Sequence, residues 1–158
     1  MSQPITFPQT VGQLPRYYNF KPSGRAYDYV LTSGKPLFEF GFGLSYTRFE
    51  YSDLMVTSPA IGPAGQVTVS VRLKNVGDRA GDEVVQLYIR DMVSSVVTPL
   101  KQLNGFQRVT LQPGASRTVE FTLGPKHLSL LDRHLQRVVE PGTFEVTVGG
   151  LKTTFDVR

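Results

Sequence analysis

The sequence predicts an all-β protein, a sandwich of about seven strands that follows an irregular, aromatic-rich N-terminal arm. Fifteen glycines and eleven prolines among 158 residues interrupt the chain too often for long helices. From about Phe49 onward, apolar and polar residues alternate, and turn residues recur roughly every eight to twelve residues, which is typical of a β-sandwich. Residues 1–48 show neither sustained alternation nor the period of a helix. We therefore expect two regions, a connector arm over 1–48 and a sandwich over 49–158.

The arm is unusually aromatic. Six of the seven tyrosines and six of the ten phenylalanines lie within residues 1–51. Such a segment would expose much apolar surface if it hung free, so we expect it to pack against its own sandwich or against another chain. The residues that we predict to form this docking surface are Phe7, Tyr17, Tyr18, Phe38, Phe40, Phe42 and Tyr46.

The strands of the predicted sandwich are recognised by alternation. In residues 66–75, QVTVSVRLKN, the apolar residues Val67, Val69, Val71 and Leu73 share one face, as in a half-buried strand. The same pattern returns in 119–123, 144–148 and 155–157. The segment DEVVQLYIR, residues 82–90, is apolar on both faces, which predicts a strand inside a sheet that is covered on each side.

The connections carry turn residues, as at Asn75-Val-Gly77-Asp78, Pro113-Gly114 and Pro141-Gly142. Asn104-Gly105 is either the turn of a hairpin or a bulge within one strand, and we favour the bulge. Residues 125–132, PKHLSLLD, favour a single helical turn.

The sequence lacks the motifs of most kinds of enzymatic catalysis. The absence of cysteine excludes disulfides and thiolate chemistry. The only histidines, His127 and His134, form no metal-ligating motif, and no GxSxG elbow exists. Asp82 and Glu83 are the most conspicuous of thirteen acidic residues, and we interpret them as solvated groups at a strand start. We predict no catalytic residue, no metal and no cofactor in this chain.

Charge and hydropathy limit the partners. The net charge of +4 is spread without a basic stripe, which argues against nucleic-acid binding. No apolar run reaches the roughly 20 residues that a membrane-spanning helix needs, and the first thirteen residues do not resemble a signal peptide. The sequence therefore predicts neither a membrane nor a nucleic-acid partner, and it leaves the cellular compartment open.

Longer strings carry a resemblance to a known family. Several segments of the chain resemble the C-terminal end of family 3 glycoside hydrolases of the β-glucosidase and β-xylosidase type. They are FGFGLSYT (40–47), GDEVVQLYIRD (81–91), LNGFQRVTL (103–111) and EPGTF (140–144), with TFP and GQLP in the arm. The resemblance covers nearly the whole chain. Glu39, Phe20 and the short segment 25–35 depart from the family pattern.

The resemblance implies a fold and a role. The fold is a fibronectin type III-like sandwich, which agrees with the strand pattern, and the arm resembles a connector that packs between domains. The family's catalytic carboxyl groups lie on a barrel domain and nearby, in parts that this chain does not contain, so no catalytic residue is transferred to it. A retaining glycosidase needs both groups about 5 to 5.5 Å apart.

The leading functional hypothesis is a non-catalytic module that stabilises or oligomerises a catalytic partner, either the barrel and α/β domains of such a glycosidase or a second copy. Two alternatives remain. The first is a stand-alone, weakly glycan-binding module that stacks sugars on Tyr17, Tyr18, Tyr27 and Tyr29. The second, less favoured, is a glycosidase that is active by itself.

Overall fold

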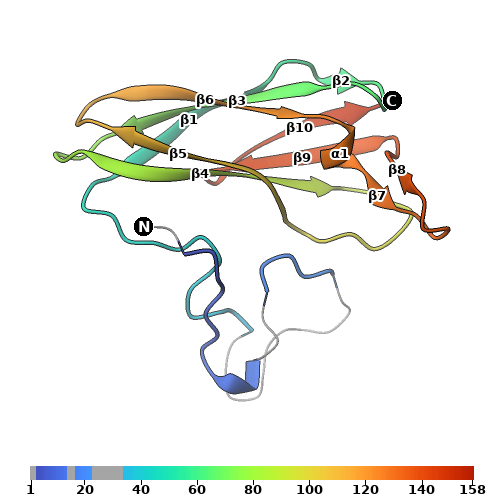
Figure 1. The fold of residues 1–158 in the computed structure, drawn as a ribbon, viewed down its shortest axis with the longest axis horizontal. Coiled ribbons are helices and arrows are strands. Elements are labelled where there is room, and N and C mark those ends of the chain that lie inside the picture. The colour runs from blue at the N-terminus through green and yellow to red at the C-terminus, as the bar shows by residue number, and fades with distance from the viewer. Residues whose placement is uncertain (1–2, 14–16, 23–33) are drawn as a thin grey trace.

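The computed structural model describes residues 3–13, 17–22 and 34–158, and it contains a sandwich of two sheets with a small hairpin at one end (Figure 1). One sheet has the order β1-β3-β6 and the other the order β2-β10-β9-β4-β5. All pairings are antiparallel except that of β10 with β2. The strands are β1 (Phe49–Val56), β2 (Ala60–Ile61), β3 (Val67–Asn75), β4 (Gly81–Asp91), β5 (Gln102–Leu111), β6 (Ser116–Leu123), β7 (Leu130–Leu131), β8 (Arg137–Val138), β9 (Gly142–Val148) and β10 (Leu151–Val157).

The predicted all-β fold is confirmed. Seven of these strands have seven residues or more, and β2, β7 and β8 have two each. The helical turn expected within 125–132 is α1 (Pro125–Leu128). Its His127 caps it, because His127 Nδ1 accepts a hydrogen bond from the Gly124 amide at 3.1 Å.

The core lies between the two sheets and consists of the residues that alternation assigned to the inner faces. Val69, Val71 and Leu73 of β3 are fully buried and belong to one core cluster with residues of β4 and β9. Phe144 and Phe155 from the paired strands β9 and β10 stack at 5.7 Å between ring centroids. Burying one such side chain is worth about 1.5 to 3 kcal/mol, so this layer dominates the stability of the sandwich.

Strand β4 lies between β9 and β5, and both of its faces are covered, as the sequence predicts. Val85, Leu87 and Ile89 face the core, whereas Tyr88 points to the outer face and is still only 6% exposed. The arm covers it there. The bulge at Gly105 is also confirmed, because the register of β5 against β4 shifts between Leu87 and Tyr88. A Cβ at Gly105 would lie 2.8 Å from Cδ1 of Phe121, so a glycine allows this close approach.

The described part of the arm is extended, with one 3-10 turn, η1 (Val11–Gln13). It is more ordered than the sequence indicates, because its two ends pair with each other. Phe7 and Phe38 form an antiparallel bridge, and Gln3 exchanges backbone hydrogen bonds with Gly41 and Phe42 at 2.9 and 3.0 Å. The buried Gln13 ties the far end, accepting from the Gln9 amide at 2.6 Å and donating to the Lys35 carbonyl at 3.3 Å.

Candidate docking surface on the N-terminal arm

One face of the arm packs against its own sandwich. The ring of Tyr18 stacks on Phe40 at 4.3 Å and meets the edge of Tyr88 at 6.1 Å. On the sandwich, Lys101 Nζ lies 4.0 Å from the centre of the Tyr88 ring. Backbone contacts fix the same junction, since the Leu100 amide donates to the Phe20 carbonyl at 3.1 Å. Tyr18 and Phe40 are therefore docked within the chain.

Burial at this junction changes the chemistry of Tyr88. Its removal from water, with smaller contributions from Tyr18 and Glu39, raises the pKa of Tyr88 to about 12. The phenol stays protonated at neutral pH, and it donates a hydrogen bond to Gln86 Oε1. The Tyr88 phenol is therefore an uncharged, hydrogen-bonded member of this junction.

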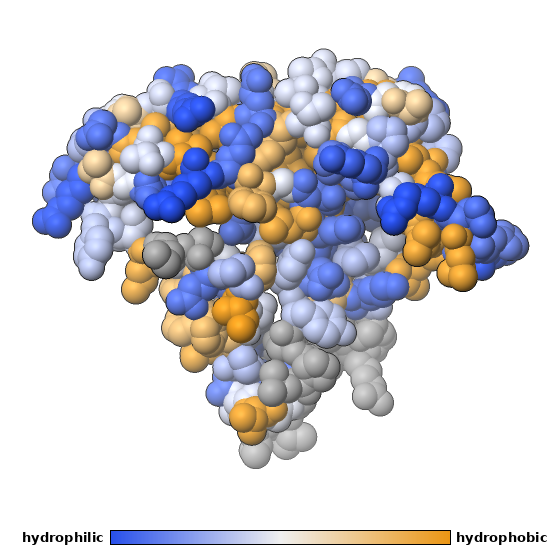
Figure 2. All heavy atoms as spheres, in the orientation of Figure 1, coloured by the Kyte–Doolittle hydropathy of each residue, from blue (hydrophilic) through white to orange (hydrophobic). Residues whose placement is uncertain are grey.

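The opposite face of the arm carries the aromatic ridge, which we define as Phe7, Phe38 and Phe42. Phe38 stacks on Phe42 at 4.6 Å and meets Phe7 edge-on at 6.2 Å. The exposed fractions are 39% for Phe7, 39% for Phe38 and 43% for Phe42. Hydrophobic surface is visible on the arm below the sandwich in Figure 2. Three adjacent, half-exposed aromatic rings are typical of an interaction site.

A tight turn separates the two faces. The Phe42 amide donates to the Glu39 carbonyl at 3.0 Å, and Gly41 has a φ of +84° at the third position of this turn. In a regular strand, residues 38, 40 and 42 would share one side. The turn instead directs Phe40 to Tyr18, which contacts the sandwich, and leaves Phe38 and Phe42 in the half-exposed ridge. A side chain at Gly41 would also collide with Gln86, since its Cβ would lie 2.7 Å from Oε1.

The structure does not bring all seven predicted residues together. Tyr18 and Phe40 face inward, and Phe7, Phe38 and Phe42 form the ridge. Tyr17 and Tyr46 are exposed, and no ring contact joins either to the others within the described residues. Tyr46 lies where the arm meets β1 and lines an open groove with Ser45, Thr47, Arg48, Val76, Gly77 and Asp78.

The tyrosine platform proposed for sugars loses one member, because both Phe40 and Tyr88 pack on the Tyr18 ring. Tyr27 and Tyr29 lie outside the described residues, and Tyr17 is exposed. The four tyrosines are therefore not seen as one surface, and glycan binding by them stays a prediction.

Sequence reasoning missed the receiving surface on the sandwich, formed by Gln86, Tyr88 and Lys101. A signal for it was present, because the apolar outer face of DEVVQLYIR requires a cover. Alternation does not reveal which segment covers this outer face, because the arm has no alternating pattern.

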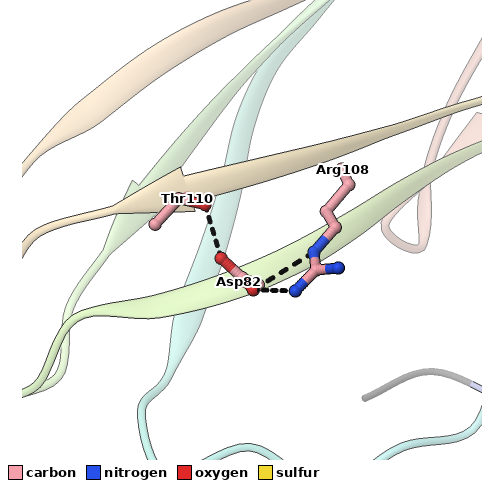
Figure 3. A network of polar contacts seen from close by, with 3 residues as sticks. All are labelled: Asp82, Arg108 and Thr110. Atoms are coloured by element: carbon pink, nitrogen blue, oxygen red, sulfur yellow. Dashed lines mark hydrogen bonds and ion pairs between the residues drawn. The ribbon is translucent and has the colours of Figure 1, made fainter.

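The acidic pair Asp82 and Glu83 does not converge, because neighbouring residues of a strand point to opposite faces. On the outer face, Asp82 accepts hydrogen bonds from Thr110 and from Arg108, with which it also forms an ion pair (Figure 3). These hydrogen bonds, that of Thr110 first, lower the pKa of the Asp82 carboxyl. Glu83 accepts from the Tyr51 hydroxyl at 2.8 Å. Both carboxylates are bound in structural contacts.

Two other site classes find no support in the part of the chain that the structure describes. Within residues 3–13, 17–22 and 34–158, no three acidic or histidine side chains gather in a way that could hold a metal ion. No helix in these ranges is long and apolar enough to cross a membrane.

Comparisons with known proteins place the chain. The fibronectin type III-like domain family matches residues 83–152. Over 98% of its length the chain is 45% identical to a β-xylosidase from Formosa agariphila, of which it covers 22%. It is 40% identical over 92% of its length to a periplasmic β-glucosidase from Salmonella typhimurium, of which it covers 20%.

Solved structures of β-glucosidases agree with these sequence matches. The chain superposes with a TM-score of 0.92 on a β-glucosidase from Erythrobacter marinus, at 42% identity, covering 97% of this chain and 21% of that one. For a β-glucosidase from Listeria innocua in complex with glucose, the TM-score is 0.90 at 33% identity, with 99% and 24% covered. The chain thus spans about a fifth of the length of these relatives. The chain carries a fibronectin type III-like domain of the kind that family 3 β-glucosidases and β-xylosidases contain, and it is not the catalytic part of such an enzyme.

Proposed function

We propose that the chain is a structural and interaction module of a family 3 glycoside hydrolase, and that its arm holds a catalytic part of that enzyme against the sandwich. One observation carries the proposal. The arm is fixed to the sandwich through Tyr18, on which Phe40 stacks, and it separately presents the aromatic ridge of Phe7, Phe38 and Phe42.

The driving force would be burial of the ridge. Apolar surface removed from water contributes about 25 cal/mol per Å², and aromatic rings add a contribution from stacking. Because the turn at Gly41 and the Phe7–Phe38 bridge already order these rings, little conformational entropy remains to be lost on binding.

The expected partner is the barrel and α/β domains of a family 3 glycosidase. The relatives support this choice, because the chain matches only about a fifth of each and the rest of each is larger than the match. A second copy of the chain, packed ridge to ridge, is the competing occupant.

Native mass spectrometry on the protein isolated from its source tests the proposal. A mass larger than 17.5 kDa by a catalytic-sized polypeptide, covalent or bound, would support the module role. A mass of 17.5 kDa would contradict it, and a simple multiple would favour self-association.

The ridge itself is tested by the double variant Phe38→Ser/Phe42→Ser, with Phe106→Ser as the matched control. Phe106 is also exposed, at 68%, but it lies on β5 rather than on the arm. We expect the double variant to lose association and the control to keep it, with the sandwich folded in both. Retained association in the double variant would exclude the ridge as the docking surface. Loss of folding would make it part of the core.

A further inference from the structure

A second surface of the molecule, the groove beside Tyr46, is separate from the aromatic ridge. It is lined by Ser45, Tyr46, Thr47, Arg48, Val76, Gly77 and Asp78. These residues come from the last part of the arm and from the loop between β3 and β4, at the end of the sandwich where the chain enters β1 (Figure 1). No ridge residue lines the groove.

The lining of the groove is ordered because the side chain of Asn75 forms hydrogen bonds with two of its residues. Asn75 is fully buried, and its amide nitrogen donates to the carbonyls of Arg79 and Leu111 at 2.7 and 3.0 Å. Its amide oxygen accepts from the Thr47 hydroxyl at 2.6 Å and from the Gly77 amide at 3.0 Å. All four hydrogen bonds that its side chain can form within this fold are therefore made, and two of them fix lining residues.

The two walls are also joined directly. The Val76 amide donates to the Arg48 carbonyl at 2.8 Å. Gly77 lies so close to the arm that a Cβ there would collide with Thr47 Oγ1. A surface that is ordered before binding loses little entropy when a ligand arrives, and this distinguishes the groove from a chance hollow between mobile loops.

The lining offers an aromatic ring and polar groups that are not used within the chain. Tyr46 is 91% exposed. Among the described residues, the side chains of Arg48 and Asp78 form no hydrogen bond or ion pair, either with each other or with a third group. Their opposite charges leave the groove without a preference for an anion or a cation, and its polar lining does not suit a purely apolar ligand.

A neutral sugar matches this combination. A pyranose ring has an apolar face of C–H groups that stacks on an aromatic ring, and hydroxyl groups at its rim that accept from a guanidinium and donate to a carboxylate. We infer that the Tyr46 groove binds one sugar ring of a neutral oligosaccharide, with Tyr46 as the stacking surface and Arg48 and Asp78 as the polar partners. The choice of β-linked glucose and xylose units as ligands rests on the proposed function. The site itself is inferred from the residues that line the groove.

The test is an NMR titration of the full, ¹⁵N-labelled chain with cellobiose and with xylobiose. We expect saturable shifts of the amide signals of residues 45–48 and 76–78, with affinity in the millimolar range because an open groove covers only part of a ligand. Tyr46→Ala should weaken binding about tenfold. The matched control Tyr17→Ala removes another exposed tyrosine, outside the groove, and should leave binding unchanged.

Three outcomes would overturn the inference: no shifts at sugar concentrations of tens of millimolar, equal shifts with glycerol at the same hydroxyl concentration, or unchanged binding by Tyr46→Ala. Tyr46 is exposed, so its replacement should not disturb the core. The amide signals outside residues 45–48 and 76–78 report whether the variant is folded. Failure here is distinguishable from failure of the proposed function, since Phe38→Ser/Phe42→Ser should abolish docking without altering this titration.

Discussion

The sandwich and the arm differ in how completely they bury their apolar side chains. In the sandwich, the inner faces of both sheets close over Leu73, Leu87 and Phe144, which water does not reach. In the described part of the arm, the one fully buried large side chain is that of Gln13, and every aromatic ring keeps some exposure. The sandwich is therefore stable through its own core, whereas the arm packs on Tyr88 of the sandwich and leaves its ridge for the partner that we propose.

The largest expected effect separates a core ring from a ridge ring. Phe144→Ala should lower the free energy of unfolding by about 3 to 5 kcal/mol, because it leaves a cavity beside Phe155. Phe38→Ala removes a ring of the same kind from the exposed ridge and should cost less than about 1 kcal/mol. Urea denaturation of the isolated chain measures both. Equal losses would show that the ridge is part of the cooperative core.

An intermediate effect is expected at the turn that divides the arm. Gly41→Ala should cost about 1 to 2 kcal/mol, because alanine disfavours a φ of +84° and its Cβ would meet Gln86. The arm should then separate from Tyr88, which hydrogen exchange at the Leu103 amide would detect, since this amide donates to the Tyr18 hydroxyl. Gly62→Ala is the control, because nothing lies near its Cβ. If Gly41→Ala leaves this exchange unchanged, the turn does not hold the arm.

The smallest effect concerns pH and the far end of β4. Burial of Asp91, opposed by a backbone hydrogen bond from Val93, raises the pKa of its carboxyl, and its Oδ1 has no hydrogen-bond partner among the described residues. A raised folded-state pKa means that the ionised form opposes folding. The stability present below the unfolded pKa of about 3.9 is therefore lost as pH rises through the folded pKa.

Asp91→Asn should therefore be more stable than the unsubstituted chain at pH 7, and this advantage should vanish near pH 3. Thermal unfolding across this pH range gives the difference between the two proteins. Asp82→Asn should behave in the opposite sense, because its carboxyl has a lowered pKa and stabilises the fold when ionised. An Asp91→Asn variant that is less stable than the unsubstituted chain at pH 7 would show that the carboxylate has a favourable partner.

The same contrast explains which features the sequence predicts. Period-two alternation determines which side chains of β3, β6 and β9 enter the core, because a shift of one residue would expose all of them. The arm has no such constraint. Its aromatic content predicts that it docks, but the inward position of Phe40 and the outward positions of Phe38 and Phe42 depend on one glycine turn.

Asn75 shows a second limit. In the sequence it opens the string Asn75-Val-Gly77-Asp78 and is interpreted as a turn residue, and its hydrogen bond from Gly77 agrees with that. Its full burial could not be predicted, because its partners Thr47 and Leu111 are 28 and 36 residues away along the chain. Long-range hydrogen bonds of this kind leave no periodic trace.

The position of Asn75 also bears on how such a module could be exchanged between proteins. Although β1 begins at Phe49, a recombination junction placed there would separate Thr47 from the buried amide and leave its oxygen short of one hydrogen bond. Gene fusion or shuffling that respects this contact must carry the last residues of the arm along with the sandwich. The unit that can be inherited intact is therefore longer than the sheet boundaries indicate.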